Sequence, residues 1–99
     1  MRIQFQRSGG FTGMRVEATI DTASLDPTKA EKVHMLVNGA GFFDLPERLH
    51  TSLKGVDELQ YVITAEEEGR RHTVYTSDGA APASLRPLLR ELTLLARSR

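Results

Sequence analysis

The sequence predicts an α+β fold in which a four-stranded, mainly antiparallel sheet carries two helices on one face. Hydrophobic residues alternate with polar ones in four short runs, and they recur at three- and four-residue spacing in two others. Glycine-rich or acidic turns separate the paired runs, and the order is ββαββα. Because each strand pattern alternates, one sheet face should be solvated and the other should be covered by the helices.

The first two strands are expected on either side of a glycine-rich turn. Ile3 and Phe5 alternate with polar neighbours, and residues 14–20 alternate in the same way. The intervening segment 8–13 contains three glycines, which permit positive φ and a turn longer than the minimal two residues. We therefore expect a hairpin with Phe11 at its tip.

The first helix should begin at Asp26-Pro27 and end at Gly39. Aspartate is a favoured N-cap residue, proline is tolerated at the first helical position, and glycine commonly follows the last turn. Hydrophobic residues recur at helical spacing through this region and just past Gly39: Ala30, Val33, Leu36, Val37 and Ala40. Residues 42–46 should then plug the edge of the core. Residues 47–55 show no period, and long irregular loops in compact domains are often functional.

A second hairpin and a second helix complete the pattern. Residues 59–65 and 71–76 alternate on either side of an acidic turn at 66–69, where Arg70 and Arg71 are expected to pair with glutamates across the strands. The helix that follows should have Ser84 as its cap and Pro87 in its first turn. Its hydrophobic face is made of leucines: Leu85, Leu88, Leu89, Leu92 and Leu95.

Composition limits the class of protein. Residues 1–99 fit one domain, and 39% hydrophobic with 26% charged residues is typical of a globular chain. Thirteen basic residues balance thirteen acidic ones, so nucleic acid is not an expected partner. There is no cysteine, no signal-peptide pattern and no apolar run long enough to span a membrane. We expect a cytoplasmic location, and the sequence does not specify an oligomeric state.

The sequence offers no constellation of residues for catalysis. His34, His50 and His72 lie on different elements without the i, i+4 spacing of a zinc-binding helix, so the free protein is expected to bind no metal and no cofactor. The carboxylates of residues 44, 47, 57 and 58 are best interpreted as solvated charges. Catalysis needs reactive groups that converge, and we therefore predict a binding module and not an enzyme.

Five segments, taken together, resemble the emfourin family of bacterial proteins. Their order and spacing cover nearly the whole chain, although no single segment is specific. They are Arg7-Ser8-Gly9-Gly10-Phe11-Thr12-Gly13, Ala40-Gly41-Phe42-Phe43-Asp44-Leu45-Pro46, Asp57-Glu58-Leu59-Gln60-Tyr61, Gly69-Arg70-Arg71-His72-Thr73-Val74 and Leu85-Arg86-Pro87-Leu88-Leu89.

The resemblance implies a protein inhibitor of thermolysin-type (protealysin-like) zinc metalloproteases. It implies that a loop aspartate ligates the catalytic zinc of the enzyme while apolar loop side chains occupy substrate subsites. A catalytic zinc has three protein ligands and an exchangeable water, so an inhibitor carboxylate can take the fourth position. The alternative is a non-catalytic protein-interaction or regulatory module with another partner.

Strand topology selects Asp21 as the zinc-ligating aspartate. If the second and third strands are antiparallel neighbours, Asp21 lies near the irregular loop 47–55. Protease contacts would then come from four residues: Thr22, Leu25, Leu49 and Leu53. A structural interpretation is also open, in which Asp21 makes a local turn and the leucines belong to the core.

Other residues remain as alternatives. Asp57 and Asp78 could share the same sheet edge as Asp21, whereas helix capping already explains Asp26. A rival docking element is the glycine-rich tip formed by Gly9, Gly10 and Phe11, which we expect at the opposite edge together with the turn 66–69. An apolar residue on such a tip suits insertion into an apolar protease pocket.

Overall fold

The computed structural model describes residues 1–9, 15–49 and 59–97, and it confirms the α+β fold in the order ββαββα. Two short 3₁₀ turns, η1 and η2, add to the expected elements. The elements are β1 (Arg2–Gly9), β2 (Val16–Asp21), η1 (Thr22–Ser24), α1 (Pro27–Ala40), η2 (Phe42–Asp44), β3 (Leu59–Glu67), β4 (Arg70–Ser77) and α2 (Arg86–Arg97).

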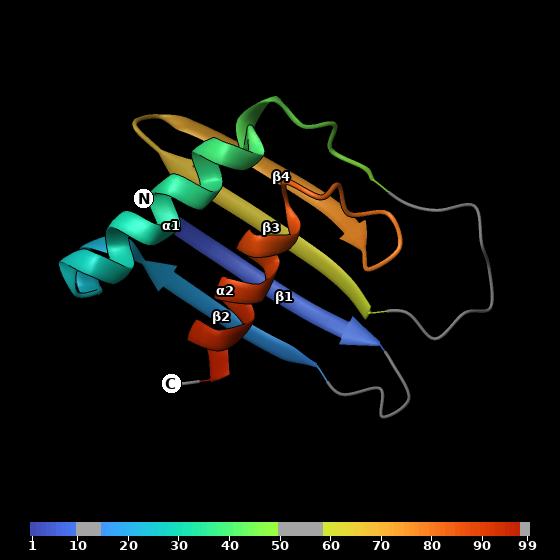
Figure 1. Ribbon diagram of the computed structural model, residues 1–99, viewed down its shortest axis with the longest axis horizontal. Helices are drawn as coiled ribbons and strands as arrows, with labels where there is room; N and C mark the ends of the chain where they lie inside the picture. The colour runs from blue at the N-terminus through green and yellow to red at the C-terminus, as the bar shows by residue number, and fades with distance from the viewer. Residues whose placement is uncertain (10–14, 50–58, 98–99) are drawn as a thin grey trace.

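The sheet has the strand order β2-β1-β3-β4, and all neighbouring strands are antiparallel (Figure 1). β1 therefore lies inside the sheet, paired with β2 along one side and with β3 along the other. Two rows of residues fix the register: Ile20, Ile3, Ala65 and His72 lie side by side, and so do Ala18, Phe5, Ile63 and Val74. Both rows belong to the face that the helices cover.

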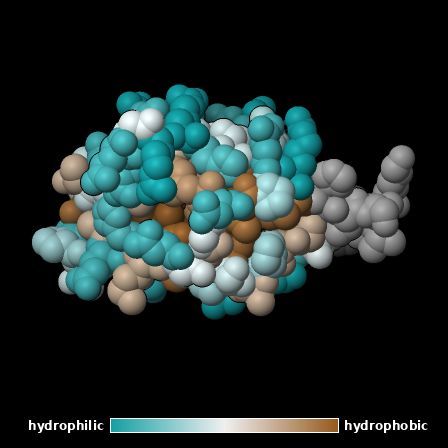
Figure 2. Space-filling view, turned by 90° about the horizontal axis from the view of Figure 1, so that it is seen from above, coloured by the Kyte–Doolittle hydropathy of each residue, from teal (hydrophilic) through white to brown (hydrophobic). Residues whose placement is uncertain are grey.

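Both helices pack on the same face of the sheet (Figure 1). The buried side chains include Ile3, Phe5 and Ile63 from the strands, Val33 and Val37 from α1, and Leu88 and Leu92 from α2. Figure 2 shows hydrophobic residues in a band across the middle of the molecule, with hydrophilic residues on both sides. The predicted leucine face of α2 is confirmed, because all five leucines are buried.

The ends of the helices differ in part from the expectation. Asp26 caps α1 as predicted, since its carboxylate accepts a hydrogen bond from the Lys29 N–H at 3.0 Å. The predicted end at Gly39 is wrong, because α1 continues to Ala40 and Gly41 adopts the left-handed conformation, with φ 60°. Ser84 lies in a turn, and α2 begins two residues later at Arg86, so the expected cap is also wrong.

The second hairpin has a two-residue turn at Glu68 and Gly69. Both residues have positive φ, 50° and 79°, as in the type I′ turns that match the twist of paired strands. Glycine adopts this conformation without strain, and glutamate does so at some cost. The predicted cross-strand charge pairing is confirmed for Arg71, which lies opposite Glu66 with N and O atoms 3.6 Å apart. The Arg70 guanidinium instead lies over the Phe43 ring, 4.2 Å from its centroid.

The segment after α1 closes one edge of the core. Phe42 is buried and packs edge-to-face against His72, so the predicted plug is confirmed. Segment 47–55 was predicted to be irregular, but its start pairs with the sheet. Arg48 forms a parallel bridge with Tyr75 of β4. Tyr75 donates its N–H to the Glu47 carbonyl, and its own carbonyl accepts from the Leu49 N–H, both at 2.7 Å. Residues 50–55 lie outside the described part of the chain.

The packing of α2 predicts a large difference between two leucines that lie close together in the helix. Leu92 has no exposed surface, whereas Leu94 is 55% exposed. We expect Leu92→Ala to lower the free energy of unfolding by roughly 2–5 kcal/mol, because a buried cavity replaces the side chain. Leu94→Ala should change it by less than about 0.5 kcal/mol. Urea unfolding followed by circular dichroism measures both, and similar losses would contradict this core assignment.

Candidate functional site

The strand order determines which loops meet, and it overturns the expected surroundings of Asp21. β1 lies between β2 and β3, so β2 and β3 are parallel to each other and not antiparallel neighbours. Asp21, at the end of β2, therefore lies level with the end of β3 and not with its beginning. Figure 1 shows the end of β2 and the β3–β4 turn at the same end of the sheet.

The described loop residues follow the same geometry. Leu49 lies at the β4 edge of the sheet, across the strands from Asp21 on β2. Gly9 lies opposite Leu59 at the far end of β1. The expectation that loop 47–55 lies beside Asp21 is therefore wrong for its described part, and the turn 66–69 lies with Asp21 instead of with Gly9. Leu53, Gly10, Phe11 and Asp57 lie outside the described residues.

Asp21 presents a carboxylate from the end of an edge strand. It is exposed, and its Oδ1 accepts a hydrogen bond from the Ala23 N–H at 3.0 Å, which caps η1. This local bond uses one acceptor position, and a carboxylate offers about four. A hollow of about 540 Å³ lies beside it, lined by Met1, Arg2, Asp21, Glu66, Glu67, Glu68 and Gly69.

A row of alternating charges crosses the open face of the sheet at this end. Asp21 lies opposite Arg2, Arg2 lies opposite Glu66, and Glu66 lies opposite Arg71. Opposite charges directly across antiparallel strands attract one another. Asp21 is the terminal member of this row, which we call the charge row.

Thr22 fixes the backbone next to Asp21. Its side chain is only 6% exposed, and its Oγ1 accepts from the Met1 ammonium at 3.1 Å and lies 3.2 Å from the Met1 carbonyl oxygen. The Thr22 N–H also donates to that carbonyl at 2.9 Å. Thr22 therefore supports the site from inside the protein, and this position favours a structural role over the protease contact expected for it.

The two described leucines of the predicted contact set lie against the core. Leu25 and Leu49 are half-buried and pack against the buried cluster, as the structural interpretation expected. Leu25 follows η1 directly, so it remains on the Asp21 side of the molecule. Leu49 is held on the other side by its bond to Tyr75.

Two other aspartates, Asp26 and Asp78, already have partners within the protein. Asp26 caps α1, as described above. Asp78 accepts a hydrogen bond from the Tyr61 hydroxyl at 2.9 Å, and its backbone carbonyl accepts from Arg86 at 2.9 Å. Burial of the phenol, with help from this hydrogen bond and the Asp78 charge, raises the pKa of Tyr61 to about 12. Sequence reasoning missed this cluster, because its members come from three separate elements.

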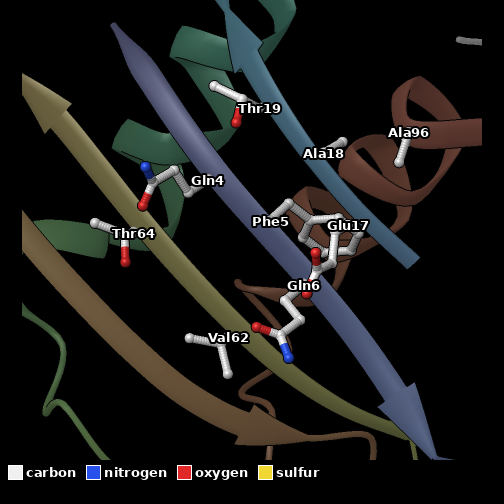
Figure 3. Close-up of a pocket in the computed structure, with 9 residues that line it drawn as sticks. All are labelled: Gln4, Phe5, Gln6, Glu17, Ala18, Thr19, Val62, Thr64 and Ala96. Carbon is white, nitrogen blue, oxygen red and sulfur yellow. The ribbon is translucent and has the colours of Figure 1, made fainter. Parts of the chain in front are cut away.

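The open face of the sheet is hollowed but does not bring reactive groups together. Figure 3 shows residues that line a hollow of about 680 Å³, among them Gln4, Gln6 and Thr64. The carboxylate among its lining residues, Glu17, pairs with Arg15 at 2.8 Å. This surface has the composition of a solvated sheet face.

The described histidines have structural partners. His72 places Nε2 2.7 Å from the Leu45 carbonyl oxygen, and His34 lies 3.4 Å from Glu67. His50 lies outside the described residues. Within residues 1–9, 15–49 and 59–97, no group of three or more potential metal ligands occurs. In the same ranges, no helix is long and apolar enough to cross a membrane.

The described elements define a small α+β protein with a four-stranded antiparallel sheet and two helices. A model of the Emfourin family matches residues 5–93, and the chain belongs to this family, as the resemblance predicted. Family membership indicates a protease-inhibitor role with a protease as the partner. No curated protein and no solved structure gives a significant match.

The burial of Tyr61, together with its hydrogen bond to Asp78, predicts a loss of stability in alkali. The pKa of Tyr61 in the folded protein, about 12, lies above the value near 10 of an unfolded tyrosine. Its contribution to folding is therefore complete below about pH 10 and is lost as the pH rises towards 12. We expect the free energy of unfolding to fall more steeply between pH 10 and 11.5 for the wild type than for Tyr61→Phe. Urea unfolding at several pH values tests this, and parallel curves would contradict it.

Proposed function

We propose that this protein inhibits a thermolysin-type zinc metalloprotease by presenting the Asp21 carboxylate to the catalytic zinc. The family match over residues 5–93 supports the inhibitor role. The observation that carries the choice of Asp21 is its presentation: an exposed carboxylate at the end of an edge strand, held by a turn whose base is tied to Met1. Loop 47–55 does not support this choice, because its described part lies at the β4 edge of the sheet.

The chemistry of the proposal follows from the coordination of a catalytic zinc. Three protein ligands leave one position for water, which the zinc activates as the nucleophile. A carboxylate oxygen at about 2.0–2.2 Å takes this position and removes the nucleophile. Asp21 can bind through Oδ2 while Oδ1 keeps the Ala23 N–H, so binding does not require η1 to unfold.

Preorganisation supports the same assignment. A carboxylate on a mobile loop would lose conformational entropy on binding, whereas the local hydrogen bonds of Asp21 and Thr22 have already fixed this segment. Leu25 is a half-buried residue that directly follows η1, and we propose that it contacts the protease next to Asp21. Leu49 lies across the sheet from Asp21, so it does not belong to this contact.

Two aspartates of similar local geometry provide a matched test. Asp21 and Asp26 are both exposed, and each accepts an N–H at 3.0 Å to cap a helical turn. Asparagine preserves such caps but removes the negative charge. We expect Asp21→Asn to raise the inhibition constant against a protealysin-like enzyme about 30-fold or more, as for an interface hot spot. Asp26→Asn should change it by less than about twofold.

The other outcomes distinguish a failure of the proposed inhibition from a failure of the Asp21 assignment alone. Full activity of the enzyme with excess wild-type protein would refute inhibition and favour an interaction module with another partner. Inhibition that is unchanged in Asp21→Asn would refute the Asp21 assignment alone. A loss of inhibition in Phe11→Ala, with Asp21→Asn intact, would favour the rival docking element at Gly9 to Phe11.

A further inference from the structure

A second candidate binding surface lies at the opposite end of the molecule from Asp21. It is a groove of about 380 Å³ between α2 and the ends of β1 and β3 at Gly9 and Leu59. Its lining combines four arginines with apolar side chains. The arginines are Arg7, Arg86, Arg90 and Arg97, and the apolar residues include Leu59 and Leu89 with Leu94; we call this surface the arginine groove.

Three of the arginines form a stripe along α2. Arg86, Arg90 and Arg97 are spaced i, i+4 and i+11, which places them within about 40° of one another around the helix. Arg7 approaches from β1, where it lies opposite Tyr61 of β3. Helix and sheet therefore supply positive charge to one groove.

Within the described part of the chain, most of this charge has no acidic partner. Asp78 is the carboxylate in the lining, and its Oδ1 already accepts from Tyr61. Arg86 donates to the Asp78 backbone carbonyl. Among the residues that the structure describes, Arg7, Arg90 and Arg97 form no ion pair, whereas Lys32, Arg15 and Arg71 each have an acidic partner. A groove with unpaired guanidinium groups favours an anionic partner.

The apolar part of the lining narrows the chemistry of that partner. Leu59 and Leu89 form part of the groove wall, and Leu94 leaves more than half of its surface exposed. Single-stranded nucleic acid is bound mainly through aromatic rings that stack on bases, and the aromatic residue here, Tyr61, is buried. The chain also has no net positive charge. Carboxylates next to apolar side chains suit the groove better than phosphates next to bases.

We propose that the arginine groove binds an acidic peptide segment of a second protein, at a site separate from the Asp21 end of the sheet. Guanidinium groups bind carboxylates through paired N–H donors. Leu59 and Leu94, which keep exposed surface, contact apolar side chains of the same segment. The stripe from Arg86 to Arg97 is roughly 16 Å long, the length of about five extended residues. This site does not depend on the proposed zinc ligation.

Fluorescence anisotropy with a short peptide tests the proposal on the full chain. The probe is a fluorescein-labelled hexapeptide of alternating glutamate and leucine, compared with one of alternating lysine and leucine. Arg90→Glu reverses one exposed charge in a helix where glutamate is a good helix former. We expect it to weaken binding of the acidic peptide about tenfold or more, since it removes a charged hydrogen-bond donor.

Lys29→Glu is the matched control. Lys29 is exposed on α1, outside the groove lining, and the substitution changes the net charge by the same amount. It should alter peptide affinity by less than about twofold at 0.15 M salt, where distant charges are largely screened. Equal weakening by both substitutions, or no binding of the acidic peptide, would overturn the proposal.

Three further readouts separate this site from its alternatives. Tighter binding of a hexathymidine oligonucleotide than of the acidic peptide would show a nucleic-acid site and overturn the proposal. A dimer in sedimentation that the peptide dissociates would make a second copy of this chain the occupant, which also overturns it. Arg90→Glu should retain protease inhibition, and Asp21→Asn should retain peptide binding. If either variant loses both protease inhibition and peptide binding, the two sites are not separate.

Discussion

The pairing of β1 on both of its sides is the constraint on which the remaining structure depends. Along one side β1 meets β2, and along the other it meets β3 over its full length from Arg2 to Gly9. This double pairing buries Ile3 and Phe5 under the helices and fixes which strand ends lie together. It therefore determines the surroundings of Asp21, although Asp21 itself lies on an edge strand.

Local features of the fold were predictable because local sequence encodes them. Asp26-Pro27 carries a cap and a compatible proline, and the leucines of α2 recur at the helical period, so each element is specified within a few residues. The hairpin turn at Gly69 is equally local. The end of α1 was predicted at Gly39 instead of Gly41 because the two glycines are close together in the sequence. The structure shows that Gly41 has the positive φ of the helix cap.

Strand order was not predictable in the same way. Alternation assigns residues to a face, but it does not say whether the third strand pairs with the first or with the second. If the third strand paired with the second, Asp21 would lie level with the beginning of the third strand. Pairing of the third strand with the first places Asp21 level with its end. The bridge between Arg48 and Tyr75 was also not predictable, because it has no periodic pattern in the sequence. The Tyr61–Asp78–Arg86 cluster likewise assembles only in three dimensions.

The charge row has a consequence for how this end of the sheet meets other molecules. Within the row, Glu66 has an arginine on each side, whereas Asp21 has a positive neighbour, Arg2, on one side only. At the other terminus, Arg71 has a negative neighbour on one side only. The row thus has an unbalanced anion at the β2 edge and an unbalanced cation at the β4 edge. A partner with the reverse polarity would be oriented across the strands before any close contact forms.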